Sequence, residues 1–175
     1  MVIACAGEQR GRELLPAVRG ERQDALAMTE PDAGSDVRGM KTQAVGQGGD
    51  RVVNGSKRLI SGAERADFFI VFVATGVDET PHGPKQRLTC FLLDRRPPGF
   101  AVREGYRSVS RCGYPDHVLT FEDCRLPETQ VPGRVDGGFE ECPQGRSVNR
   151  VPRHGTGRRP RSSGDRRGRP RTCRC

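Results

Sequence analysis

The segment that decides the fold is "ADFFIVFVAT", which runs from Ala66 to Thr75. It is an unbroken series of aromatic, β-branched and small residues. This composition is typical of a strand that is buried on both of its faces. We therefore expect Ala66–Thr75 to form a central strand of a sheet, and a helix over Phe68–Val73 would contradict that prediction.

Other β-type runs lie on both sides of this strand. Residues 40–61, "MKTQAVGQGGDRVVNGSKRLIS", hold two runs joined at Gly48-Gly49-Asp50, and Asn54-Gly55 adds a hairpin signal because both residues tolerate a positive φ. Residues 76–86, "GVDETPHGPKQ", are expected to be a polar loop. Three later runs are expected to be strands, namely "RLTCFLLD", "GFAVREGY" and "HVLTFEDCRL". About seven or eight short strands without a long helical pattern indicate a mainly β fold, an antiparallel barrel or sandwich, over residues 22–131.

The two ends of the chain differ from this region. Residues 8–19, "EQRGRELLPAVR", predict a short helix with an apolar face of Leu14, Leu15 and Val18. Residues 151–175 contain no Leu, Ile, Phe or Met. Such a segment cannot bury enough apolar surface to offset its conformational entropy. We therefore predict that residues 132–175 are a disordered basic tail.

The net charge of +8 comes from that tail. Residues 151–175 hold nine Arg and one acid, whereas residues 1–150 are neutral overall. The basic composition therefore does not argue that the folded part binds nucleic acid. An Arg-rich tail that binds nucleic acid or another partner is the alternative function, and salt-sensitive RNA binding by the tail peptide would support it.

The cysteines and apolar runs give further expectations. The seven Cys form no C-x-x-C pair, and their spacing fits neither a zinc site nor a disulfide framework. We expect no metal site, buried thiols at Cys90 and Cys124, and a cytoplasmic protein. No apolar run reaches the roughly 18 residues that a membrane span needs, and we identify no signal peptide at the N-terminus.

A second segment, "MTEPDAGSD" at residues 28–36, is rich in loop chemistry. Pro31 fixes one φ and Gly34 frees another, so backbone N–H groups and the hydroxyls of Thr29 and Ser35 can face a planar ligand or a phosphate. A solvated turn is the plainer interpretation of the same residues. Glu30 and Asp36 form a candidate acid–base pair, but capping of the loop is the favoured role, because neither has the apolar sequence context that tunes a carboxylate.

Three segments together resemble a known family. "MTEPDAGSD", then "GGDRVVNGSKRLISGAERADFFIVFVAT", then "GYRSVSRCGYPDHVLTFEDCRLPE" are similar, in order and spacing, to the middle β-domain of the acyl-CoA dehydrogenases. The resemblance covers about residues 22–131. Residues 8–21 resemble the last helix of the family's N-terminal helical domain, so we interpret residues 1–21 as a remnant of that domain.

The resemblance implies a flavin site in these segments. It implies that the main chain of Leu26, Ala27, Met28 and Thr29, with the Thr29 hydroxyl, hydrogen-bonds the FAD ring. Gly34 and Ser35 would lie in the same loop, with Ser35 near the flavin pyrophosphate and the acyl-CoA. The family segment Lys-x-Trp-Ile-Thr corresponds to Lys57–Ser61, so Leu59, Ile60 and Ser61 would also contact the cofactor. A Ser61 hydroxyl near flavin N5 would favour hydride acceptance.

The sequence departs from the family at two packing positions. Leu26 stands where an aromatic residue is common, and Leu59 replaces the usual Trp. Both changes remove area that would pack on the flavin. The resemblance therefore predicts a weakened FAD site.

The resemblance also implies an activity, α,β-dehydrogenation of an acyl-CoA with hydride transfer to FAD. Its implied partners are the acyl-CoA, an electron-transfer flavoprotein or similar acceptor, and other copies of the chain. The family's general base lies in a C-terminal helical domain, and nothing after Pro132 resembles that domain, so we assign no catalytic residue and expect an inactive fragment. The change of composition after "VDGGFE" suggests the hypothesis of a shifted reading frame, which sequencing of the locus would test.

Overall fold

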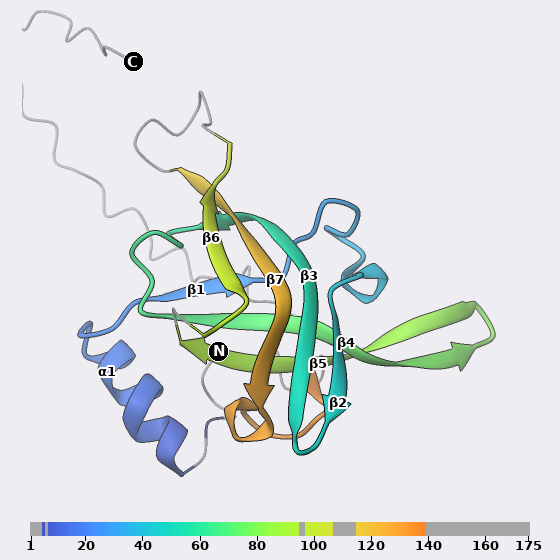
Figure 1. Ribbon diagram of the computed structural model, residues 1–175, viewed down its shortest axis with the longest axis horizontal. Helices are drawn as coiled ribbons and strands as arrows, with labels where there is room; N and C mark the ends of the chain where they lie inside the picture. The colour runs from blue at the N-terminus through green and yellow to red at the C-terminus, as the bar shows by residue number, and fades with distance from the viewer. Residues whose placement is uncertain (1–4, 6, 95–96, 107–114, 139–175) are drawn as a thin grey trace, which may run out of the picture.

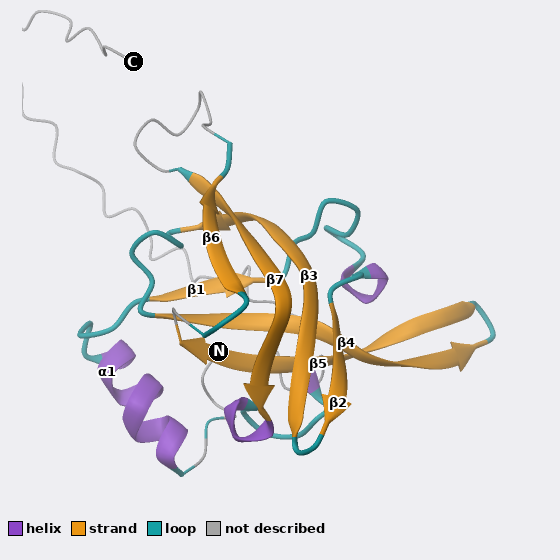
Figure 2. Cartoon of the chain, viewed as in Figure 1, coloured by secondary structure: helices purple, strands orange, loops and turns teal. Residues whose placement is uncertain are grey.

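The protein is mainly β, with one curled sheet and a short N-terminal helix (Figure 2). In this computed structural model, the described residues are 5, 7–94, 97–106 and 115–138. The strands are β1 (Asp24–Ala27), β2 (Gln43–Gln47), β3 (Asp50–Ser61), β4 (Phe68–Thr80), β5 (Gly83–Asp94), β6 (Phe100–Glu104) and β7 (Asp116–Pro127). The helical elements are η1 (Arg10–Leu14), α1 (Leu15–Val18), η2 (Val37–Gly39) and η3 (Glu128–Gln130).

The strands of the described chain form a seven-stranded sheet with the order β1-β4-β2-β3-β7-β6, and β5 pairs with β4 off this path (Figure 1). Four pairings are antiparallel: β2 with β3, β3 with β7, β4 with β5, and β6 with β7. β1 and β2 each run parallel to β4. The predicted barrel-type β architecture is confirmed, and the parallel pairings make the sheet a mixed one.

Strand β4 contributes to two apolar cores, one on each of its faces. Phe69, Val71 and Val73 pack in one cluster with Phe91, Leu119 and Phe121. Alternate residues of the same strand pack in a second cluster, which contains Phe68, Ile70, Phe72, Leu88 and Leu92. Successive side chains of a strand point to opposite faces, so an unbroken apolar run supplies both cores. The prediction from the sequence that this strand is central and buried is confirmed.

The Asn54-Gly55 hairpin prediction is wrong. The hairpin between β2 and β3 turns at Gly48 and Gly49, which have φ values of 61° and 90°. Asn54 and Gly55 lie within β3, where the pairing with β7 shifts register between Val53 and Gly55. Gly55 has φ 141°, and a Cβ there would lie 2.7 Å from the Thr42 Cα. Its missing side chain thus serves a bulge and a close backbone approach.

The prediction of a polar loop at residues 76–86 is also wrong. Strand β4 continues to Thr80 and β5 begins at Gly83, so this segment is a hairpin arm that projects from the sheet (Figure 1). Backbone pairing needs no apolar side chains, and ion pairs such as Arg87 with Asp78 accompany it. The Thr80 hydroxyl donates to the Gly83 carbonyl at 2.7 Å and closes the turn.

The expected N-terminal helix is present but presents a different face. Leu15 and Val18 are 41% and 75% exposed, whereas Glu13 is 1% exposed. Residues 10–14 form a π-helical turn, which is wider than an α-helical turn and rotates the following side chains. The Gln9 side chain donates to the Thr129 and Val131 carbonyls at 2.7 and 3.0 Å and joins this segment to η3 and its C-terminal end.

Several other expectations can be compared with the described chain. Cys90 and Cys124 are buried free thiols, as predicted. Burial raises the pKa of Cys124 to about 11, so it stays a thiol at neutral pH. No helix within the described ranges is long and apolar enough to span a membrane.

Within the predicted tail, residues 132–138 are described, and there Val135 packs against the first core cluster and Asp136 accepts a hydrogen bond from the Thr75 hydroxyl. The predicted disorder therefore does not begin at residue 132. Residues 139–175 lie outside the described ranges, and the proposed domain boundaries stay predictions.

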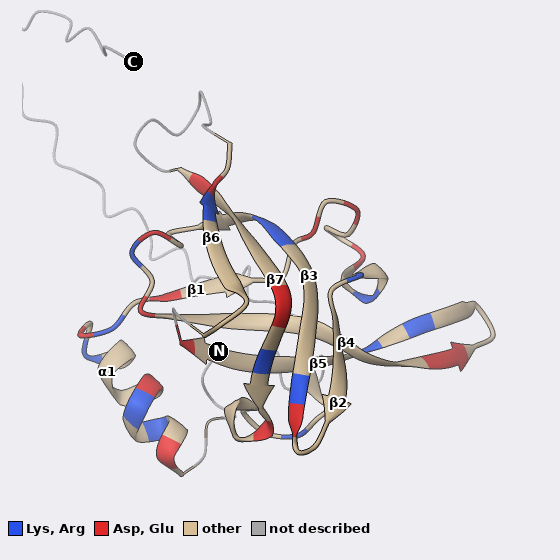
Figure 3. Ribbon diagram, viewed as in Figure 1, with Lys and Arg blue, Asp and Glu red and all other residues tan. Residues whose placement is uncertain are grey.

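Charge is mixed over the described part of the molecule. Figure 3 shows that acidic and basic segments are interspersed along the ribbon, on the strands as well as on the loops. This pattern agrees with the neutral composition of residues 1–150. The nucleic-acid alternative therefore depends on residues 151–175 alone, which lie outside the described ranges.

The two-sided burial of β4 predicts a large cost for truncating one of its aromatic side chains. Phe69 is fully buried, and its ring lies 5.1 Å from the Phe100 ring in an edge-to-face contact. Phe69→Ala should lower the free energy of unfolding by about 3–5 kcal/mol, measured by urea denaturation. Val45→Ala, at a position 65% exposed, is the matched control and should stay within about 0.5 kcal/mol of the parent. A loss at Phe69 no larger than that of the control would contradict the central place of β4.

Candidate functional site

The structure brings the two segments of the predicted flavin site together. The Arg58 amide donates to the Thr29 carbonyl at 2.9 Å. The Lys57 ammonium donates to the Met28 carbonyl at 3.2 Å. The end of β1 and the loop after it therefore lie against the second half of β3, although about thirty residues separate them in the sequence.

A buried ion pair lies directly under this junction. Lys57 is 0% exposed and Glu30 is 4% exposed. The Lys57 Nζ donates to the Glu30 Oε1 at 2.7 Å, and it also contacts the Met40 sulfur at 3.6 Å. The backbone amides of Lys41 and Thr42 donate to the same carboxylate. The Glu30 carboxylate thus connects the start of the loop, where Glu30 lies, to the end of the loop at Lys41 and Thr42 and, through Lys57, to β3.

The surroundings of this pair explain the protonation of its acid. Burial alone raises the pKa of Glu30, but hydrogen bonds from Lys57, Thr42 and Lys41 outweigh that effect and hold the pKa below its ordinary value. Burial lowers the pKa of Lys57, and the bond to Glu30 opposes that change. Glu30 is therefore an ionised anchor that supports the loop. The predicted capping role is confirmed for Glu30, whereas Asp36, at the start of η2, makes no side-chain capping hydrogen bond. The burial of Glu30 is not expected from its sequence context.

Leu59 occupies an unusual backbone position. Its φ is 57°, a left-handed conformation that a Leu rarely adopts. It lies between Lys57 and Ile60, where the pairing of β3 with β7 shifts register. The bulge turns the Leu59 side chain outward to 43% exposure, whereas the neighbouring Ile60 is buried in the core. Strain of this kind collects at functional sites.

The Ser61 hydroxyl has a partner that sequence reasoning did not identify. It donates to the Asp116 Oδ1 at 3.0 Å. The two residues are register partners on β3 and β7. Next to them, the buried His117 Nδ1 lies 3.3 Å from the Glu64 carboxylate. No local signal in the sequence pairs Ser61 with Asp116, because the contact depends on a register that includes two bulges.

The other predicted site residues fall into two groups. Ala27 and Ile60 have side chains in the apolar core, so they can offer a ligand only their main chain. Leu26 and Met28 are partly buried against the second core cluster. Gly34 and Ser35 are exposed, in a turn whose start is closed by the Glu30 amide donating to the Ala33 carbonyl at 2.8 Å.

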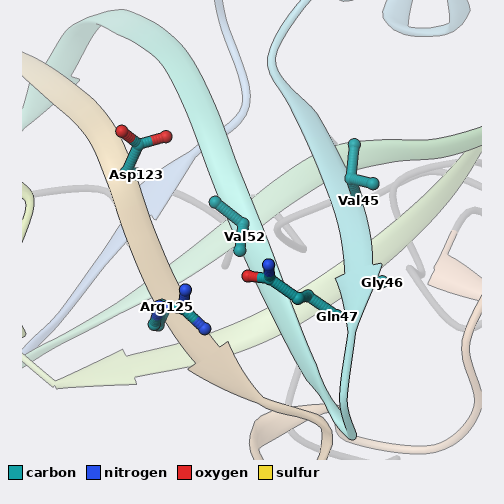
Figure 4. A pocket seen from close by; sticks show the side chains of 6 residues that line it. All are labelled: Val45, Gly46, Gln47, Val52, Asp123 and Arg125. Atoms are coloured by element: carbon teal, nitrogen blue, oxygen red, sulfur yellow. The ribbon is translucent and has the colours of Figure 1, made fainter.

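A separate hollow lies on the outer face of β2, β3 and β7 (Figure 4). Its lining residues are Val45, Gly46, Gln47, Val52, Asp123 and Arg125. None of the predicted flavin-site residues lines it. Over the described ranges, no group of three or more potential metal-ligating side chains is present.

Comparison with known protein families identifies this arrangement. Residues 25–124 match the family described as "Acyl-CoA dehydrogenase, middle domain". The chain belongs to the acyl-CoA dehydrogenase family. The match begins at β1 and ends in β7, so both segments of the site lie within it.

Individual relatives agree with this family assignment. The rat mitochondrial short/branched chain specific acyl-CoA dehydrogenase is 37% identical over 138 residues, which are 76% of this chain and 30% of the relative. A glutaryl-CoA dehydrogenase from Mycobacterium smegmatis, solved in complex with FADH2, is 28% identical with a TM-score of 0.65, over 75% of this chain and 32% of that one. A chain from a structure of the electron transferring flavoprotein of Acidaminococcus fermentans is 32% identical with a TM-score of 0.67, over 76% and 34%. The chain thus spans about a third of the length of these relatives.

The backbone at Leu59 yields a test of the strain described above. Leu59→Gly and Leu59→Ala both remove the side chain, but only Gly adopts a positive φ without a steric penalty. The Gly variant should therefore be more stable than the Ala variant by about 1 kcal/mol, measured by urea denaturation. The same two substitutions at Val45, which lacks a positive φ, should give the opposite order. An Ala variant as stable as the Gly variant at position 59 would show that the bulge relaxes.

Proposed function

We propose that this chain supplies the flavin-contacting β-domain of an acyl-CoA dehydrogenase, which oxidises the Cα–Cβ bond of an acyl-CoA. The observation that carries the proposal is the junction of residues 26–29 with residues 57–61. The matched family and the FADH2 complex of the M. smegmatis relative support FAD as the cofactor.

The residues at the junction suit a flat, partly polar ring. Strand β1 stands at one end of the sheet order and pairs, among the described strands, with β4 alone, so the main-chain groups of its other edge are not used in sheet pairing and can be offered to a ligand. The Thr29 and Ser61 hydroxyls add polar contacts, and the outward Leu59 side chain adds apolar surface. Flavin sites combine these features, with hydrogen bonds at the ring edge and apolar contact on its faces.

Bound FAD would accept the hydride that leaves Cβ of the acyl-CoA. The residues of this chain would hold and orient the ring for that transfer. The Ser61 hydroxyl donates a hydrogen bond to Asp116, so its oxygen can accept a hydrogen bond from a ligand N–H while that contact persists. A hydrogen bond from Ser61 to the ligand requires release of the Asp116 contact, because a hydroxyl has one proton to donate.

The remaining assignments are parts of the same proposal. Ser35, exposed beyond the loop turn, would approach the flavin pyrophosphate and the acyl-CoA. An electron-transfer flavoprotein is the proposed acceptor, and the A. fermentans match supports it. Assembly with further copies of the chain and a cytoplasmic location complete the proposal.

The first test is flavin binding. Purified chain should bind added FAD, as measured by flavin fluorescence and absorbance. Thr29→Val should weaken binding about two- to twelvefold, because a net hydrogen bond is worth about 0.5–1.5 kcal/mol. Thr129→Val, at an exposed position in η3, is the matched control and should bind as the parent does. Failure of the parent chain to bind FAD at any accessible concentration would sink the proposal for this chain.

The second test is turnover. The reaction needs a base for the Cα proton, and the carboxylates that contact the site are engaged, Glu30 with Lys57 and Asp116 with Ser61. General-base catalysis is typically worth about 10²–10⁴-fold. We therefore expect no dye reduction above background from the 175-residue chain with FAD and a panel of acyl-CoAs. Turnover at the rate of a full-length relative would overturn this expectation and would direct the search for the base to Asp116.

A further inference from the structure

We propose that the buried Lys57–Glu30 pair is a positioning device for the ligand loop, residues 28–42, and that it sets the direction of the Met28–Thr29 peptide. This inference rests on the proposed function for the identity of the ligand. It assigns to both residues a role that is separate from the stability of the fold.

The contacts of the pair all converge on this one loop. A Lys ammonium has three N–H donors, and the three contacts of Lys57 are the Met28 carbonyl, the Glu30 carboxylate and the Met40 sulfur. The carboxylate in turn accepts the amides of Lys41 and Thr42. The loop is thus fastened to β3 at its start and at its return through a single charged centre.

This fastening determines where one backbone donor points. The carbonyl and the N–H of a trans peptide point in opposite directions. Because Lys57 holds the Met28 carbonyl inward, the Thr29 N–H points in the opposite direction within the same peptide plane. No acceptor for this N–H occurs among the residues that the structure describes. The neighbouring Thr29 carbonyl is held by the Arg58 amide, so the peptide is fixed on both sides and its free donor is presented to a ligand.

The physical chemistry of buried ion pairs separates this role from a structural one. A buried pair loses hydration when the chain folds, and its replacement by well-packed hydrophobic side chains of similar volume is often neutral for stability. Removal of one partner alone is destabilising, because the other charge stays buried. A neutral double replacement should therefore keep the fold while it releases the loop.

The test compares the double variant Lys57→Met with Glu30→Gln against the parent chain. Amide hydrogen exchange without flavin should be at least about tenfold faster at Arg58, whose amide donates to the Thr29 carbonyl, while the urea midpoint stays near that of the parent. The Thr42 amide should change less, because the Gln side chain that replaces Glu30 still has an oxygen that accepts a hydrogen bond. FAD affinity should fall at least about tenfold, the effect of 1.4 kcal/mol. The matched control is the double variant Arg87→Met with Asp78→Asn, which neutralises an exposed ion pair outside the loop and should leave exchange and affinity unchanged.

Each outcome decides a separate point. A double variant with parental exchange at Arg58 and parental FAD affinity would overturn the inference, and so would a double variant that unfolds, because the pair would then be a requirement of the fold. If the parent chain fails to bind FAD, the proposed function fails, whereas the exchange measurement still decides whether the pair positions the loop.

Discussion

Burial of β4 on both of its faces is the constraint on which the rest of the structure depends. An unbroken apolar strand must be covered twice, and the chain covers it with two separate clusters. β5 pairs along its whole length, and β1 and β2 pair in parallel beside it. Because β1 is aligned on β4 from Asp24 to Ala27, the residue at which β1 ends is fixed, and the loop that carries the ligand groups begins there.

The ion pair of Lys57 and Glu30 is the second level of this organisation. The sheet brings β3 close to the end of β1, but sheet pairing alone does not shape a loop that leaves the sheet. A charged pair in an apolar environment tolerates few arrangements, since each unsatisfied donor or acceptor there is costly. The bonds of the pair to Met28, Met40, Lys41 and Thr42 are therefore well suited to give the loop a single conformation. The same region contains Leu59 in a strained left-handed conformation. A well-fixed loop and a strained backbone position therefore occur together at the site.

Part of this arrangement could be predicted from the sequence, through its residue types and its resemblance to a known family. The apolar run at Ala66–Thr75 predicted a central strand, and the family resemblance of residues 28–36 and 57–61 identified the two segments of the candidate site. The prediction of a hairpin turn at Asn54-Gly55 was wrong because a Gly with positive φ fits a bulge as well as a turn. The prediction of a loop at residues 76–86 was wrong because an exposed hairpin arm is held by backbone pairing and does not need apolar side chains. The prediction of the buried face of the N-terminal helix was wrong because a π-helical turn changes the helical period.

The sequence by itself determined the class of the fold, its central strand and the chemical inventory of the loop, because these depend on local composition and on periodicity. The tertiary structure alone decided that Glu30 is a buried anchor, that Lys57 holds the Met28 carbonyl and that Ser61 donates to Asp116. Each of these contacts joins residues that are 27 or more positions apart. Their geometry depends on strand order, on register and on two bulges in β3. A one-residue shift of that register would turn the side chains of β3 to the opposite face, and the same residues would then make none of these contacts.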